Sequence, residues 1–328
     1  MILGGTWRVP VAEGLLDEDF VEQLQMSGTY NEDSFDREYG SVWYGDASSA
    51  FFTSELFDRY RKLKQPEYKY SGRSTKTSYY IIGVDVGRFD CTTEAAVFKV
   101  TPQAQGTSIK TLVNLYTYNA EHFEDQAIHI KKLFFKFRAR GLAIDANGVG
   151  AGFVDFMVKS QVDPETNDIL PPFGVLNDED GKYKKLRTAD TVADAMFLIK
   201  ATAAINSEIY AYIKTQMSSG KIKTLIDEVE AKAKLMLTKA GQKMTPEERN
   251  EYLRPFIETS ILREQMLNMA QKDEDRVNIV LKQVNRKVKK DKFSAFMYGL
   301  YFIEQEEERA KKRRSFNIAD LLLFSKAG

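Results

Sequence analysis

The sequence predicts an α/β domain, in which a mixed β-sheet is flanked by helices. Apolar runs at 79–86 and 93–101 have the composition of strands, and the short turn between them joins them as a pair. A third such run, 111–120, follows a turn rich in Gln, Gly and Thr. Next come an amphipathic helix at 122–141 and a wholly apolar strand at 142–146, which is typical of a central strand buried on both faces. This order of strands and helices favours a mixed sheet with helices packed against it.

Further elements are expected after this core. In chain order they are a helix at 150–161, a short strand near 173–176, a long helix from Thr188 to Ile213, a helical insertion at 227–270, a strand at 276–283 and a helix from Asp291 to Ala310. Within the insertion, Thr245 followed by Pro246 is a favourable helix start.

The chain before the sheet is aromatic, acidic and irregular. We expect residues 1–75 to form a connector, with a helix at 15–25 and two helices separated by a turn within 34–63. The polar stretch 69–78 marks a boundary, which places the main domain at 76–310. Residues 311–328 form a basic run followed by an apolar tail.

The composition excludes several classes of site. The chain has 328 residues, with 47 basic and 47 acidic side chains, so its net charge does not indicate a generally basic nucleic-acid binder. One cysteine and two histidines exclude an internal disulfide and the commonest zinc sites. No apolar run approaches the ~20 residues that span a bilayer, and the first residues do not have the pattern of a signal peptide, so we expect an intracellular protein.

Three aspartates carry the chemical information in the sequence. Asp85 and Asp145 stand at the ends of buried strands, and Asp291 opens an apolar helix. A carboxylate at the end of a buried strand is costly unless a cation or a donor meets it. If the three converge, they form a set of oxygen ligands suited to Mg²⁺ or Mn²⁺. The turn after Asp85 places Asp90 near the same ligands. Each could instead be an ordinary turn or helix-cap residue.

Basic residues gather around the third aspartate, which suggests a polyanionic substrate beside the metal. The cluster that we expect to contact such a substrate consists of Lys282, Arg286, Lys287, Lys289, Lys290 and Lys292. Five more cations lie on the predicted helix at 122–141: Lys131, Lys132, Lys136, Arg138 and Arg140. A solvated helix face explains these five at least as well as contact with the substrate does.

The motifs GVDVGRFD, AIDANGVGAG and KKDKFSAFMYGL resemble, in order and spacing, the three acidic motifs of the nuclease domain of tailed-bacteriophage terminase large subunits. The segment SFDREYGSVWYG (34–45) resembles the link between the terminase ATPase and nuclease. The resemblance covers roughly residues 30–310. It implies an RNase H-like fold and a metal-binding triad of Asp85, Asp145 and Asp291, with Asp90 as an accessory acid.

The same resemblance implies an activity and its partners. The activity would be two-metal endonucleolytic cleavage of concatemeric double-stranded DNA with two Mg²⁺ or Mn²⁺ ions. The partners would be double-stranded DNA, the portal or procapsid and the small terminase subunit, in the cytoplasm of an infected bacterial host and without a membrane. The chain lacks a GxxxxGK[ST] phosphate loop, so the resemblance is to the nuclease half of a terminase.

Two other classes of function compete with this one. The first is an actin-like or sugar-kinase ATPase, in which GVDVG and Asn147-Gly148-Val149-Gly150 would be phosphate loops. The turn after Asp85 lacks the small, hydroxyl-rich residues of such a loop, and no later Gly-Gly adenosine motif follows. The second is a non-catalytic assembly module, which would bind metal weakly and dock through its apolar tail.

Overall fold

The computed structural model describes residues 8–17, 19, 21, 50–72, 78–87, 92–104, 106–119, 122–188, 190–272 and 278–324. The chain divides into two compact units, Met1–Ser49 and Ala50–Gly328. Helix α1 (Arg8–Ala12) belongs to the first unit. The second unit contains the β-sheet, and it includes residues 50–75 of the expected connector.

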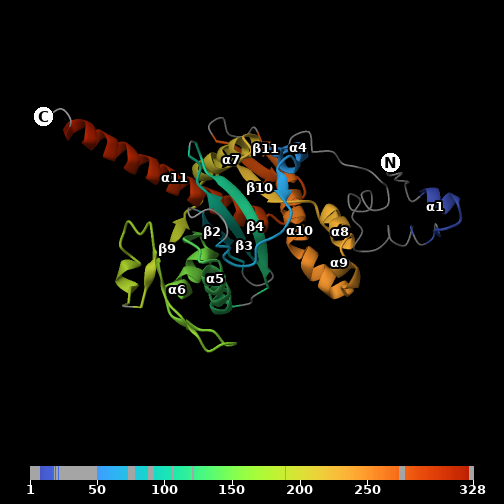
Figure 1. Ribbon diagram of the computed structural model, residues 1–328, viewed down its shortest axis with the longest axis horizontal. Helices are drawn as coiled ribbons and strands as arrows, with labels where there is room; N and C mark the ends of the chain where they lie inside the picture. Colours follow the sequence, from blue (N-terminus) through green and yellow to red (C-terminus); the bar gives the residue numbers. More distant parts are fainter. Residues whose placement is uncertain are drawn as a thin grey trace. The chain divides into compact units, whose positions relative to one another are not determined.

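An eight-stranded mixed sheet forms the centre of the second unit (Figure 1), which confirms the predicted fold class. The strand order is β1-β10-β4-β3-β2-β5-β9-β8. Strand β3 is antiparallel to both of its neighbours, β2 and β4, and all other neighbouring pairs are parallel. The strands of this sheet are β1 (Arg61–Leu63), β2 (Tyr79–Asp85), β3 (Thr93–Thr101), β4 (Ile109–Tyr118), β5 (Gly141–Asp145), β8 (Phe173–Val175), β9 (Val192–Ile199) and β10 (Ile222–Leu225). Two small hairpins lie outside it: β6 (Gln161–Val162) with β7 (Ile169–Leu170), and β11 (Met269–Lys272) with β12 (Val280–Gln283).

Helices cover both faces of the sheet, and each face has its own hydrophobic cluster. The helices are α4 (Ser54–Asp58), α5 (Phe123–Phe137), α6 (Val149–Met157), α7 (Ala203–Ser218), α8 (Glu228–Met236), α9 (Lys239–Lys243), α10 (Pro246–Leu267) and α11 (Asp291–Phe324), with a 3₁₀ turn at Lys184–Leu186. One cluster contains side chains of α7, α10 and α11, and the other contains side chains of α5 and α6. None of the helices in the described part of the chain combines the length and apolar character needed to cross a membrane.

The alternation of side chains along the central strands decides which residues face α11. Ile81 of β2 and Ala143 of β5 belong to the cluster that includes α11, whereas Ile82, Val84 and Ile144 belong to the cluster with α5 and α6. Because successive strand residues point to opposite faces, the last residue of each strand points to the α11 side. Those last residues are Asp85 and Asp145.

Gly83 brings α11 into backbone contact with β2. A methyl group on Gly83 would lie 2.1 Å from the carbonyl oxygen of Ala295 and 2.5 Å from the amide nitrogen of Gly299. These distances leave no room for any side chain, so glycine permits the close approach of helix and strand. Asp291 lies one helical turn before Ala295 and is thereby held near the end of β2.

The long helix predicted from Thr188 to Ile213 is wrong in its first half. The apolar stretch VADAMFLI forms strand β9, paired in parallel with β5 and with β8, and α7 begins only at Ala203. A short apolar run has no periodicity that separates a buried strand from a buried helix. Two further short strands of the sheet, β1 and β10, are not predicted from the sequence, and neither are the hairpin strands β6, β7 and β11.

Other expected elements need smaller corrections. Most of the helix expected at 15–25 and residues 34–49 of the expected helical pair lie outside the described residues. The described end of that pair is the short helix α4 followed by strand β1, not a long helix. The expected strand at 276–283 is shorter, β12, and α11 continues past Ala310 to Phe324. The insertion at 227–270 is helical as predicted, with a capping box formed by Thr245 and Glu248 at the start of α10.

Lys131 of α5 is fully buried in the core on the α5 and α6 side. Its Nζ donates to the carbonyl oxygen of Lys159 at 2.5 Å and to Oε1 of Gln161. Burial lowers the pKa of Lys131 to about 7. A neutral amine has two N–H donors, and the two acceptors match them.

Candidate metal and DNA site

Three predicted carboxylates lie on one side of the sheet, at one end of its central strands. Val84 of β2 is paired in parallel with Ile144 of β5, so Asp85 and Asp145 end neighbouring strands side by side. Asp291 is the first residue of α11, the helix that packs on this face. The structure therefore brings the three acidic motifs to one place.

The row of polar side chains continues across the sheet. Glu94 of β3 lies directly opposite Asp85, and Thr117 of β4 lies opposite Glu94. Glu94 is 3% exposed, although the rest of its strand is mostly apolar. Thr117 donates to Oε2 of Glu94 at 2.8 Å, and Thr92 donates to Oε1 at 2.9 Å. The result is a line Thr117–Glu94–Asp85–Asp145 on the face toward α11.

Asp145 is oriented by two donors. The hydroxyl of Tyr298 on α11 donates to Oδ2 at 2.9 Å, and the backbone N–H of Asn147 donates to Oδ1 at 2.9 Å. Burial, followed by the nearby charge of Asp145, raises the pKa of Tyr298, so the phenol stays protonated and remains a donor. These two bonds fix the carboxylate while its remaining lone pairs can serve another ligand.

Asp85 is the electrostatic centre of the site. Burial raises its pKa to about 8, and the charges of Asp291 and then Asp145 add to this effect. Lys290 opposes the rise, and Glu94 contributes to it. Like charges brought this close repel one another unless a proton or a metal ion neutralises them.

The donor set suits a hard divalent cation, because carboxylate oxygens are the preferred ligands of Mg²⁺ and Mn²⁺. Among the residues that the structure describes, however, no group of three acidic, histidine or cysteine side chains is arranged to hold an ion. The three aspartates thus lie within electrostatic range of one another but do not form a closed cage. Asp90 lies outside the described residues.

The predicted DNA-contacting cluster divides into two parts. Lys282, Arg286, Lys287, Lys289 and Lys290 are exposed. Lys282, Arg286 and Lys290 line a cavity of ≈350 Å³ beside the β11–β12 hairpin. Lys290 also lies close enough to Asp85 to affect its pKa, so this basic surface adjoins the carboxylates.

The prediction that Lys292 belongs to that DNA-contacting cluster is wrong. Its side chain is 6% exposed, and it forms ion pairs with Glu94 at 2.7 Å and Glu258 at 2.8 Å. The position after a helix-capping aspartate looked like an exposed surface position, but it points into the sheet. A buried, doubly paired ammonium is not available to a DNA phosphate.

Most of the cations on and just after α5 also contact other side chains of the protein. Lys131 is buried, and Lys132 forms ion pairs with Asp163 and Glu165. The guanidinium groups of Arg138 and Arg140 lie over the rings of Tyr70 and Tyr79. Lys136 is exposed. The structure therefore favours structural roles for most of this set.

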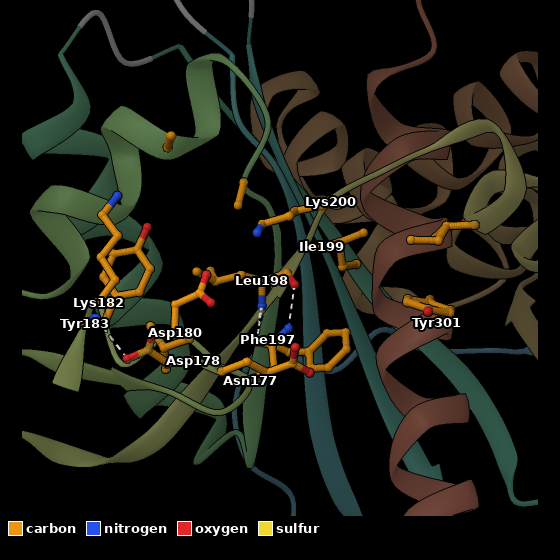
Figure 2. Close-up of a pocket in the computed structure, with 15 residues that line it drawn as sticks. Asn177, Asp178, Asp180, Lys182, Tyr183, Phe197, Leu198, Ile199, Lys200 and Tyr301 are labelled. Carbon is orange, nitrogen blue, oxygen red and sulfur yellow. Dashed lines mark hydrogen bonds between the residues drawn. The ribbon is translucent and has the colours of Figure 1, made fainter.

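Two cavities flank the carboxylates. One, of ≈390 Å³, lies between β3, α10 and the start of α11 and includes Glu94, Glu258 and Asp291 in its wall. The other, also of ≈390 Å³, opens beside Ala146 at the carboxyl ends of β5, β8 and β9. Figure 2 shows the second cavity between the loop that carries Asp178 to Tyr183 and the end of β9 at Phe197 to Ile199, with Lys200 directly after it and Tyr301 of α11 on the other side. Glu94 and Asp291 thus line the first cavity, and Ala146 in the wall of the second directly follows Asp145.

Sequence reasoning missed four polar residues of this site: Glu94, Thr117, Glu258 and Tyr298. The available signal for Glu94 was an acid inside an apolar strand that pairs, across a short turn, with the strand ending at Asp85. The other three are brought to the site only by the tertiary packing of β4, α10 and α11, which their local sequence does not reveal.

No family model matches this sequence, and no curated protein matches it. The search of solved structures finds the large terminase nuclease of thermophilic phage G20c with bound magnesium, at 14% identity and a TM-score of 0.40, covering 77% of this chain and 97% of that chain. It also finds the Thermus phage P74-26 large terminase nuclease domain, at 12% identity and a TM-score of 0.35, covering 72% and 90%.

A longer match is the large terminase of another thermophilic bacteriophage in complex with ATP-γ-S, at 13% identity and a TM-score of 0.38, covering 86% of this chain. The aligned part is 52% of that terminase chain, so the match spans about half of that protein. These three solved structures are phage large terminases or their nuclease domains, the same family that the three acidic motifs resemble.

Proposed function

We propose that this chain is the nuclease module of a phage genome-packaging terminase, a metal-dependent endonuclease that cuts double-stranded DNA. The observation that carries the proposal is the placement of Asp85 and Asp145 at the ends of adjacent parallel strands, facing the helix that begins with Asp291. The motif resemblance supports the same interpretation.

In this proposal the three aspartates bind two Mg²⁺ or Mn²⁺ ions. Asp85 is central because, besides burial, the charges of both Asp291 and Asp145 raise its pKa, and a bound cation would neutralise that repulsion. When bound, such ions activate water and neutralise the charge that develops on the phosphate during phosphodiester hydrolysis. Asp90, beside the same motif, would be an accessory acid.

The chain's own groups have defined roles in the reaction. Tyr298 and the N–H of Asn147 hold the Asp145 carboxylate in one orientation, which pre-organises the ligand before a cation arrives. The exposed cations Lys282, Arg286, Lys287, Lys289 and Lys290 would neutralise backbone phosphates and guide the duplex toward the acids. Such contacts carry little sequence information, which suits a nuclease with loose sequence preference.

The partners proposed for the intact packaging motor are the portal or procapsid and the small terminase subunit, in the cytoplasm of the infected host. Lys292 is left out of the DNA surface because it is buried.

The test is plasmid nicking with Mn²⁺ by the purified chain. Asp85→Asn and Asp291→Asn should each lower the rate by at least about a hundredfold, because losing a ligand costs more than the 10–100-fold effect of losing a group that only supports one. Asp155→Asn is the matched control, since Asp155 is an exposed residue of α6, and it should cut at the normal rate. Undiminished cleavage by both Asp85→Asn and Asp291→Asn would refute the assignment.

A further inference from the structure

Lys292 is the hub of a buried polar network beside the three aspartates. Its Nζ lies 2.7 Å from Oε2 of Glu94, 2.8 Å from Oε2 of Glu258 and 2.6 Å from Oγ1 of Thr117. The ammonium donates hydrogen bonds to Glu94 and Thr117 and pairs with Glu258 by charge alone, since Oε2 of Glu258 accepts no hydrogen bond. The three partners come from three different elements: β3, β4 and α10. Lys292 thus connects the first turn of α11 to three parts of the domain.

Glu94 is a supporting residue in this network and not a free ligand. Oε2 faces Lys292 and Thr117, and Oε1 accepts from Thr92 at 2.9 Å. A carboxylate has about four lone-pair sites, and protein donors take three of them in Glu94, compared with two in Asp145, which leaves Glu94 little capacity for a metal. It lies directly opposite Asp85, so it anchors Lys292 next to the carboxylates.

A second contact fixes the same turn of α11. The backbone N–H of Phe293 donates to Oε1 of Gln265 on α10 at 3.0 Å. The first turn of a helix has N–H groups without partners inside the helix, and this one is satisfied from a neighbouring helix. Asp291 therefore starts a helix whose first turn is held from several directions.

We propose that Lys292 is a positioning residue: held by Glu94, Glu258 and Thr117, it fixes Asp291 relative to Asp85 and so determines how tightly the site binds a divalent cation. The inference rests on the proposed function, since it assumes that these aspartates bind metal. Residues that only orient metal ligands typically change affinity by 10–100-fold when they are lost.

Lys292→Met separates positioning from simple charge. Removing a positive charge beside the carboxylates makes the site more negative, so electrostatics alone predicts tighter metal binding. Loss of positioning predicts the opposite, because Asp291 is no longer held where it can share a cation with Asp85. The sign of the change in affinity therefore discriminates between the two.

The experiment is a Mn²⁺ titration of the whole chain without DNA, with bound Mn²⁺ measured by electron paramagnetic resonance. Lys292→Met should raise the Kd at least tenfold. The matched control is Lys99→Met, which breaks an ion pair of the same length, 2.7 Å to Glu67, at the other end of β3. It should leave the Kd within about twofold of the wild-type value, below the effect expected of a residue that orients a ligand.

Thr117→Val provides a second variant if Lys292→Met fails to fold. It removes one hydroxyl that contacts both Lys292 and Glu94, at an exposed position and without any change in charge. It should raise the Kd severalfold, and Thr111→Val on the same strand should not.

The outcomes distinguish the two levels of the argument. If wild-type Mn²⁺ binding is unaffected by Asp85→Asn, the proposed function fails. If Asp85→Asn abolishes binding but Lys292→Met, or Thr117→Val in its place, leaves the Kd unchanged or lowers it, the positioning role fails and the proposed function stands.

Discussion

Gly83→Ala is the substitution that links the packing of the fold most directly to the site. The added methyl group would lie 2.1 Å from the Ala295 carbonyl oxygen, 2.5 Å from the Gly299 nitrogen and 2.8 Å from the Gly299 Cα. All three are backbone atoms, so no side-chain rotation relieves the overlap. Ordinary contact begins near 3.4 Å, and α11 must therefore move away from β2 by about 1 Å or distort.

This displacement should affect both stability and activity. Overpacking of a well-filled core costs about 1–3 kcal/mol, and we expect the free energy of unfolding to fall by that amount. The movement also carries Asp291 away from Asp85. Because a misplacement of about 1 Å can cost roughly a hundredfold in rate, nicking should fall about a hundredfold in the variant that is still folded.

Urea unfolding followed by circular dichroism measures the first effect, and plasmid nicking with Mn²⁺ measures the second. Gly72→Ala is the control, because its methyl group would meet only the side chain of Tyr70 at an ordinary 3.4 Å. It should match the wild type in both assays. Wild-type stability and activity in Gly83→Ala would show that α11 does not hold Asp291 through this contact.

Two further predictions concern DNA binding and pH. Replacing Lys287, Lys289 and Lys290 by Ala should reduce the slope of log K for DNA binding against log salt concentration by up to about 2–3, since each phosphate contact contributes about 0.9. The control replaces the exposed Lys62, Lys64 and Lys69 by Ala and should leave the slope unchanged. An unchanged slope in the first variant, or an equal loss in the control, would contradict the proposed DNA surface. The pKa of Lys131 is about 7 in the folded protein, against an ordinary value of 10.5. Between pH 7 and pH 10.5 the unfolded chain therefore binds more protons than the folded protein, and the free energy of unfolding rises with pH. From pH 7 to pH 9 the wild type should gain up to about 2 kcal/mol relative to Lys131→Met in urea unfolding. Lys136→Met, an exposed position on the same helix, should show no such difference from the wild type, and a pH-independent Lys131→Met effect would refute the neutral amine.

The sequence predicted the part of the fold in which local pattern and tertiary role agree. Strands β2, β3, β4 and β5 and helix α5 have distinct apolar patterns and clear turns between them. Strand β9 was predicted as helix because its apolar run has no strand-specific alternation; it is a strand because β5 and β8 pair with it on both sides. That pairing is a tertiary fact, invisible in a local window.

The candidate site shows the same division. Asp85 and Asp145 could be predicted to meet, since the carboxyl ends of neighbouring parallel strands lie at one edge of a sheet. Lys292 could not be separated from its exposed neighbours, because sequence shows a run of cations but not which of them points inward. Glu258 comes from α10, an earlier part of the chain, and only the folded structure places it beside Lys292.

The most direct test of the central claim is anomalous scattering from crystals of this chain soaked in Mn²⁺. The account predicts anomalous peaks between the carboxylates of Asp85, Asp145 and Asp291, and their loss in Asp85→Asn crystals. Mn²⁺ bound only at other positions, or no peak among these three aspartates at saturating Mn²⁺, would contradict it.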